Sequence, residues 1–184
     1  HVTEHSFPTR RSSDLEIAAL FAQELGKELV IENMDFDAVC LSVGQHKCDI
    51  AMAGLTINEE REEYVTFSDP YYKASQRLVT LADDTAFDDC KDAASVEEVL
   101  KGLSASDKIG GQQGTTAQYF VEGSDDWGFE GLPAEWVPYK SASLAVQDMI
   151  NGNVKYVIID AAPAESITKR SEEHTSELQS LHSI

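Results

Sequence analysis

The sequence has no long hydrophobic run and few basic side chains, and each shortage argues against a class of protein. Its longest apolar stretches, such as residues 156–159, are as long as a strand, far short of the roughly 18 residues that a membrane-spanning helix needs. Only 14 basic side chains stand against 33 acidic ones, which gives a formal charge of −19. This charge repels nucleic-acid phosphates and anionic lipids, so we expect neither as a partner.

Cysteine is also scarce, and its spacing argues against a metal centre. Cys40, Cys48 and Cys90 form no Cys-x-x-Cys pair, and only His46 lies near two of them. The spacing of Cys40, His46 and Cys48 matches no zinc-binding pattern, so we interpret the cysteines as free thiols, with a metal site as the alternative. We expect no cofactor.

The two ends differ in composition from the middle. Residues 1–15 and 170–184 hold four of the five histidines and many serines, without helical or strand periodicity. Both stretches resemble translated sequencing-adapter DNA, and residues 1–15 lack the apolar region of a signal peptide. We therefore expect two non-native tails, with natural disordered tails as the alternative.

The first half of the remaining chain, residues 16–82, alternates between strand and helix patterns. Such alternation predicts a parallel sheet covered by helices, an α/β fold. Residues 56–63 form a polar loop or a short helical turn. The sequence predicts helices at 16–25 and 36–43 and strands at 29–31, 49–53 and 76–81.

Acidic residues interrupt this pattern at 83–92, so we predict a boundary between two lobes after residue 82. The second lobe, residues 83–169, repeats the alternation, and its first helix begins with a Ser-x-x-Glu capping box at Ser95 and Glu98. The sequence predicts helices at 95–100, 116–121 and 141–150 and strands at 108–111, 135–137 and 156–159.

Polar groups follow several of these strands, at the ends where ligands bind in open α/β sheets. Arg61 offers a guanidinium that can donate two parallel hydrogen bonds to a carboxylate. The helix start at Thr116 favours an anion. Asp160 and the Gly54 carbonyl can accept from an ammonium group. Together these groups fit a zwitterion.

Each of these features also has a purely structural interpretation. Arg61 lies among four glutamates, as it would on an exposed helix face with salt bridges. Residues 114–116 fit an ordinary strand-to-helix turn, and Asp160 fits a cap for a following helix. Three aromatic residues fit either the core or the surface: Phe36, Tyr71 and Tyr72.

Four separated segments, in order and at matching spacing, resemble the family 3 bacterial solute-binding proteins, which have the type 2 periplasmic-binding fold. The longest runs from Ala53 to Tyr72, and the others are residues 34–37, 109–116 and 145–160. The resemblance covers about residues 16–169. It implies two α/β lobes, each a mostly parallel sheet flanked by helices, which close on a ligand by a hinge. We expect the family's first strand and the loop after it, and the family's C-terminal strands and helix, to be missing from this chain.

The resemblance also implies a function. It implies capture of a free polar amino acid outside the cytoplasm, in the periplasm or on a lipid anchor at the outer face of the membrane. The partner it implies is the permease of an ABC importer, and the family is mostly monomeric and not enzymatic. Two alternatives share the fold: a cyclohexadienyl-dehydratase-like enzyme, and the sensing domain of a receptor kinase or a lyase.

In the first lobe, the resemblance assigns roles to five residues. Arg61 holds the α-carboxylate of the ligand. Thr56 and the backbone of Ala53 and Gly54 contact the amino group or the carboxylate. Phe36 packs against the ligand's side chain.

In the second lobe, the resemblance assigns roles to four more residues. Thr116, with Thr115 beside it, donates to the carboxylate, and Asp160 receives the α-ammonium. Gln112 falls where selectivity for the ligand's side chain is often set, and a neutral amide there suits a polar ligand.

Overall fold

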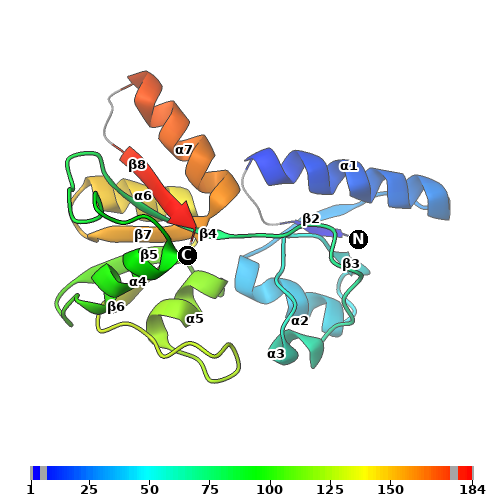
Figure 1. Cartoon of the computed structure of the whole chain (residues 1–184). Coiled ribbons are helices and arrows are strands. Elements are labelled where there is room, and N and C mark those ends of the chain that lie inside the picture. Colours follow the sequence, from blue (N-terminus) through cyan, green and yellow to red (C-terminus); the bar gives the residue numbers. More distant parts are fainter. Residues whose placement is uncertain (1, 5–7, 175–177, 184) are drawn as a thin grey trace. The chain divides into compact units, whose positions relative to one another are not determined.

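The protein consists of two compact units, His1–Lys73 and Ala74–Ile184, called unit 1 and unit 2 below (Figure 1). The computed structural model describes residues 2–4, 8–174 and 178–183, with side chains described at 14–169 and at Leu178. Both units are α/β, as the sequence predicts. Among the helices so described, none is long and apolar enough to span a membrane.

Unit 1 has a three-stranded parallel sheet in the order β2-β1-β3. Its strands are short, and the two predicted from sequence lie one or two residues away from their expected positions. The strands are β1 (Val2–Glu4), β2 (Ile31–Asn33) and β3 (Ile50–Ala51). The helices are α1 (Pro8–Leu25), the 3-10 turn η1 (Phe36–Ala38), α2 (Val39–Gly44) and α3 (Glu59–Glu62).

The central strand and the start of α1 come from the terminal stretch in which the sequence shows no periodicity. Strand β1 pairs with both of its neighbours, for example Val2 with Ile31. The buried Asp14 of α1 accepts a hydrogen bond of 3.3 Å from the Tyr71 hydroxyl. A three-residue strand is too short for a sequence pattern to reveal it. The expectation that residues 1–15 and 170–184 are non-native concerns their origin and stays a prediction.

Unit 2 has a five-stranded sheet in the order β6-β5-β7-β4-β8. Strands β6, β5 and β7 are parallel, and β4 runs antiparallel to both of its neighbours. The strands are β4 (Gln76–Leu81), β5 (Lys108–Gln112), β6 (Glu135–Tyr139), β7 (Tyr156–Asp160) and β8 (Leu178–Ser183). The helices are α4 (Ala93–Lys101), α5 (Thr116–Glu122), α6 (Ala142–Ile150) and α7 (Ala161–His174).

The units divide after Lys73, earlier than the boundary expected after residue 82. The reason is the pairing of β4, which sequence patterns do not reveal. Gln76 lies opposite Asp160 and Val79 opposite Val157, so β4 belongs to the sheet of unit 2. The acidic segment 83–92 is therefore a connection inside unit 2, between β4 and α4.

A continuous hydrophobic core fills unit 2. Leu78, Ile109 and Ile158 come from three strands of the sheet and are fully buried. Helix α4 adds Val96 and Leu100 to the same core. This packing fixes the register of β5 against β7, and with it the place where both strands end.

Helix α4 begins differently from the sequence prediction. Asp92, not Ser95, is the N-cap: its carboxylate accepts from the Ser95 N–H at 2.9 Å, and the Ser95 hydroxyl accepts from the Asp92 N–H at 3.1 Å. The helix therefore starts two residues earlier than predicted, at Ala93. Aspartate is as good an N-cap as serine, so the pattern was compatible with either start.

Candidate functional site

In unit 1, the candidate site is built around α3, a single turn that holds Arg61. Asn58 is its N-cap, and the Asn58 side-chain oxygen accepts from the Arg61 backbone N–H at 3.0 Å. Asparagine is among the preferred residues for this position. Three glutamates in the turn suit the positive end of a helix. The local sequence thus specifies the turn that orients Arg61.

The Arg61 side chain is buried, although its glutamate neighbours are exposed. Arg61 is only 9% exposed, and its Nη1 donates to the Thr56 carbonyl at 2.7 Å. The guanidinium carbon lies 5.7 Å from the centre of the Phe36 ring. A cation taken out of water needs such partners. The interpretation of Arg61 as part of an exposed salt-bridge face is therefore wrong.

The Arg61 charge also reaches the neighbouring helix α2. Burial raises the pKa of the Cys40 thiol, and the positive charge of Arg61 opposes that rise. Cys40, Cys48 and Cys90 are free thiols. No group of three or more potential metal ligands occurs among the residues whose side chains are described.

The chain between β3 and α3 supplies the remaining unit 1 candidates. Ala53, two residues after the end of β3, is buried, and Gly54 follows with a φ of +61°. A residue with a Cβ rarely adopts that conformation, so glycine is favoured there. The segment then turns so that the Thr56 carbonyl meets Arg61. Arg61 thus donates to Thr56 and lies over the Phe36 ring, so these three candidates lie close together in unit 1.

In unit 2, the segment after β5 forms a tight turn into α5. The Thr115 hydroxyl donates to the Gln112 carbonyl at 2.7 Å, and the Gly114 N–H donates to the Gln118 side-chain oxygen at 2.8 Å. Thr115 is the N-cap of α5, and Thr116 is its first residue. The Gln112 amide donates to the Lys140 carbonyl at 3.3 Å. These bonds hold the turn in one shape, with both threonines at its end.

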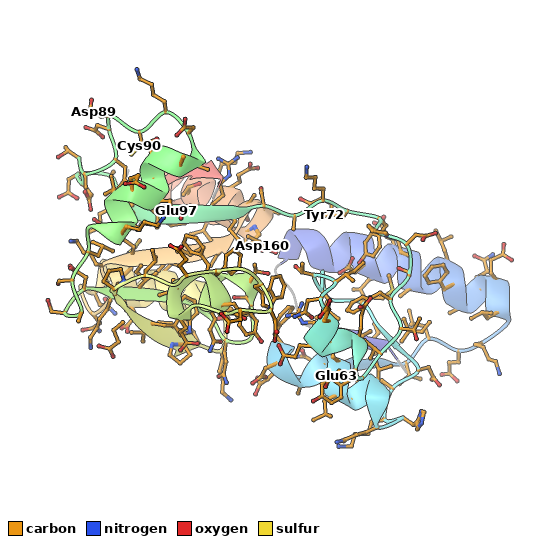
Figure 2. The ribbon with its side chains drawn as sticks, turned by 60° about the horizontal axis from the view of Figure 1, so that its bottom comes forward. Glu63, Tyr72, Asp89, Cys90, Glu97 and Asp160 are labelled. Atoms are coloured by element: carbon orange, nitrogen blue, oxygen red, sulfur yellow. The ribbon has the colours of Figure 1, made fainter. Side chains whose placement is uncertain are left out.

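Asp160 ends β7 and lies beside the start of β4. Its carboxylate accepts a hydrogen bond from the Gln76 amide nitrogen, across the antiparallel pair. Figure 2 labels Asp160 among the side chains of unit 2. Because β5 and β7 are parallel neighbours, Gln112 and Asp160 both lie at the carboxyl edge of the sheet, where ligands bind in this architecture.

The sequence analysis did not identify two residues that orient these groups. Asn58 stands three residues before Arg61, which is the spacing between an N-cap side chain and the backbone N–H that donates to it, so the sequence held this signal. Gln76 is opposite Asp160 only because of the register between β4 and β7, so no local signal points to it. Asp160 therefore has a hydrogen-bond partner across the sheet, so capping the following helix is not its one structural contact among the described residues.

The match to a known protein family extends over most of the chain. The family described as bacterial extracellular solute-binding proteins, family 3, matches residues 13–177. Among curated relatives, the putative ABC transporter arginine-binding protein 2 of Escherichia coli K12 is 30% identical, over 87% of this chain and 62% of its own length. The histidine-binding periplasmic protein of the same strain is 26% identical, over 82% and 52%. The chain therefore spans little more than half the length of these relatives.

Solved structures give the same result for the fold. An ancestral arginine-binding protein bound to arginine aligns with a TM-score of 0.80 and 27% identity, over all of this chain and 78% of its own. The fold is that of the type 2 periplasmic-binding proteins, and the prediction of this class is confirmed. Taken with the family match, this shows that the chain belongs to the bacterial extracellular solute-binding proteins of family 3.

Proposed function

We propose that this protein binds a free polar amino acid outside the cytoplasm and delivers it to the permease of an ABC importer. The observation that supports this most is the buried guanidinium of Arg61, held by the Thr56 carbonyl and the Phe36 ring. A buried, oriented guanidinium suits a carboxylate, because its fork of N–H donors can form two parallel hydrogen bonds. The relatives named as arginine- and histidine-binding proteins support the same class of ligand.

In this proposal, the charged ends of the amino acid determine the roles of the candidate residues. Arg61 donates to the α-carboxylate, and Thr116, with Thr115 beside it, donates to it as well. Asp160 accepts from the α-ammonium. Five of the nine candidates come from unit 1 and four from unit 2.

The ligand's side chain is the less constrained part of the proposal. Ala53 and Gly54 offer backbone groups, and Phe36 an aromatic face. The side-chain nitrogen of Gln112 donates to the Lys140 carbonyl, which leaves the side-chain oxygen of Gln112 as an acceptor for the ligand's polar side chain. The formal charge of −19 raises the local concentration of cations. We therefore propose arginine first and histidine second.

The setting of this activity follows from the family. A family of extracellular solute-binding proteins works outside the cytoplasm. We propose a monomer that is either free in the periplasm or held by a lipid anchor. No cofactor enters the proposal.

We propose binding without turnover. In this proposal, the carboxylate of Asp160 at the strand ends is used for binding, which leaves it no role as a general acid or base. A dehydratase-like enzyme on this fold is the second candidate, and a sensor domain is the third. Recovery of the intact amino acid after prolonged incubation with the protein separates a binder from an enzyme.

A thermal-shift screen against the twenty amino acids, cystine and ornithine tests the proposal. A ligand at about 100 times its dissociation constant stabilises the folded state by about 2.7 kcal/mol. We expect a clear shift with arginine or histidine and none with most apolar amino acids. A folded protein that shows no shift with any of them would contradict the proposal.

A further inference from the structure

Gln76 and Asp160 form a side-chain pair at the point where the chain enters unit 2. They lie opposite one another in the β4–β7 register, and the next residues continue the pairing, with Ala161 donating its N–H to the Ser75 carbonyl at 2.9 Å. The pair is therefore fixed by backbone hydrogen bonds on both sides of it. A side chain placed in this way can hold its partner in one orientation.

Chemistry determines which end of the Gln76 amide faces Asp160. A carboxylate only accepts hydrogen bonds, so the amide nitrogen has to point to it, as it does. The amide oxygen of Gln76 is then the atom that the carboxylate does not use, and it remains an acceptor.

That amide oxygen, Oε1 of Gln76, is buried and has no hydrogen-bond partner within the part of the chain that the structure describes. A buried acceptor without a donor destabilises the folded state. A donor supplied by a ligand would remove that cost. Oε1 belongs to the same amide group whose nitrogen donates to Asp160. A ligand group with several N–H donors could therefore bind both Oε1 and the Asp160 carboxylate.

We propose that Gln76 is a second recognition residue for the α-ammonium of the ligand, in addition to holding Asp160 in position. This rests on the proposed function, in which Asp160 accepts from that ammonium. An ammonium has three N–H donors, so a charged acceptor and a neutral one can bind it together. The pair then distinguishes an amino acid from the same molecule without its amino group.

The experiment compares two ligands by isothermal titration calorimetry. One is arginine, and the other is 5-guanidinopentanoic acid, which lacks only the α-amino group. The quantity measured is the ratio of their affinities. If thermal shift selects histidine, the pair is histidine and 3-(imidazol-4-yl)propanoic acid. A residue that merely supports the fold would change both affinities alike and leave the ratio unchanged.

Gln76→Leu keeps the approximate size of the side chain and removes its donor and acceptor. We expect affinity for the amino acid to fall about 10- to 100-fold, which corresponds to one or two hydrogen bonds to charged groups. The variant's affinity for the des-amino ligand should stay within about twofold of the parent value, a difference no larger than the usual error of such comparisons. Gln147→Leu on the exposed face of α6 is the matched control, and we expect both affinities to stay at their parent values.

Gln76→Glu gives an independent test in the opposite direction. It removes the N–H that donates to Asp160 but keeps an acceptor and adds a second negative charge beside that carboxylate. Because the added charge attracts the ammonium, the ratio of amino-acid to des-amino affinity should rise above that of the parent protein. This variant has nearly the shape of glutamine and serves as the test if Gln76→Leu does not fold. Circular dichroism of each variant checks folding.

The outcomes separate the two proposals. A parent protein that binds no amino acid overturns the proposed function and this inference with it. A parent protein that binds the amino acid, with a ratio that neither Gln76 variant changes, overturns only the inference. A lower ratio in Gln76→Leu and a higher one in Gln76→Glu support it.

Discussion

Unit 1 and unit 2 hold their candidate residues by different means. Unit 2 has a continuous core, and ten of the eleven large side chains that are fully buried belong to it; among the described side chains, Val39 is the one from unit 1. In unit 1, helix α1 leaves Leu20, 61% exposed, and Leu25, 65% exposed, facing water. The more thinly packed unit nevertheless buries the guanidinium of Arg61.

The difference shows that a candidate recognition group can be oriented mainly by local contacts. Arg61, its cap Asn58 and its acceptor Thr56 lie within six residues of sequence, so few long-range contacts are needed to orient it. Asp160 and Gln76 are 84 residues apart and meet only through the register of the unit 2 sheet. Damage to a core should therefore affect the candidate residues of unit 1 and those of unit 2 differently.

The largest expected effect is on the stability of unit 2. Leu78→Ala removes a fully buried side chain from β4, and we expect a loss of about 2–5 kcal/mol in the free energy of unfolding. Leu25→Ala in α1 is the matched control from unit 1 and should change it by less than about 0.5 kcal/mol, because Leu25 is exposed. Urea denaturation measures both. Equal losses from the two variants would contradict the comparison.

A smaller effect should come from the cap that orients Arg61. We expect Asn58→Ala to cost about 1 kcal/mol of α3 stability, because the Arg61 N–H loses its acceptor. Ligand affinity should fall with it, since α3 holds the guanidinium. Ser141→Ala removes the N-cap of α6 in unit 2, at a similar cost in unfolding free energy but with affinity retained. If both variants weakened binding equally, α3 would not be a local support for the site.

The smallest effect is an acid dependence located in unit 2. Hydrogen bonds from the Ser104 backbone N–H and hydroxyl, with one from the Lys155 ammonium, lower the pKa of Asp107 to about 2. An unfolded aspartate has a pKa of about 3.9. The stabilising contribution of Asp107 is therefore complete above about pH 5 and is lost as the pH falls towards 2.

Asp107→Asn tests this. The difference in unfolding free energy between the parent protein and the variant should shrink between about pH 5 and pH 2, because the parent loses the contribution that the variant lacks. Denaturation at several pH values measures it. A difference that stays constant over this range would show that Asp107 is not held as described.

The sequence predicts local structure well and pairing poorly. The strands at 76–81 and 156–159 and the helix at 141–150 appear within one residue of their predicted bounds, because each has an apolar pattern and a clear end. The assignment of β4 to unit 2 and the presence of β1 depend on hydrogen bonds between distant segments. Such bonds leave no pattern within a strand.

The same distinction applies to the candidate site. Resemblance to the family's segments pointed to Arg61, Thr56 and Phe36, and the structure places Thr56 and Phe36 beside Arg61. The sequence alone left Arg61 equally compatible with an exposed face, since its glutamate neighbours are those of a surface helix. Gln76 could not be predicted, because its importance depends on what lies across the sheet.

The central claim is that Arg61 recognises the α-carboxylate of an amino acid, and calorimetry with two ligands tests it most directly. The ligands are the amino acid selected by thermal shift and its α-methyl ester, which lacks the negative charge. The parent protein should bind the ester more weakly by about 2–5 kcal/mol. Arg61→Ala, checked for folding by urea denaturation, should bind the amino acid more weakly by a similar amount and no longer distinguish it from the ester. An Arg61→Ala variant that binds the amino acid as tightly as the parent protein would contradict the account.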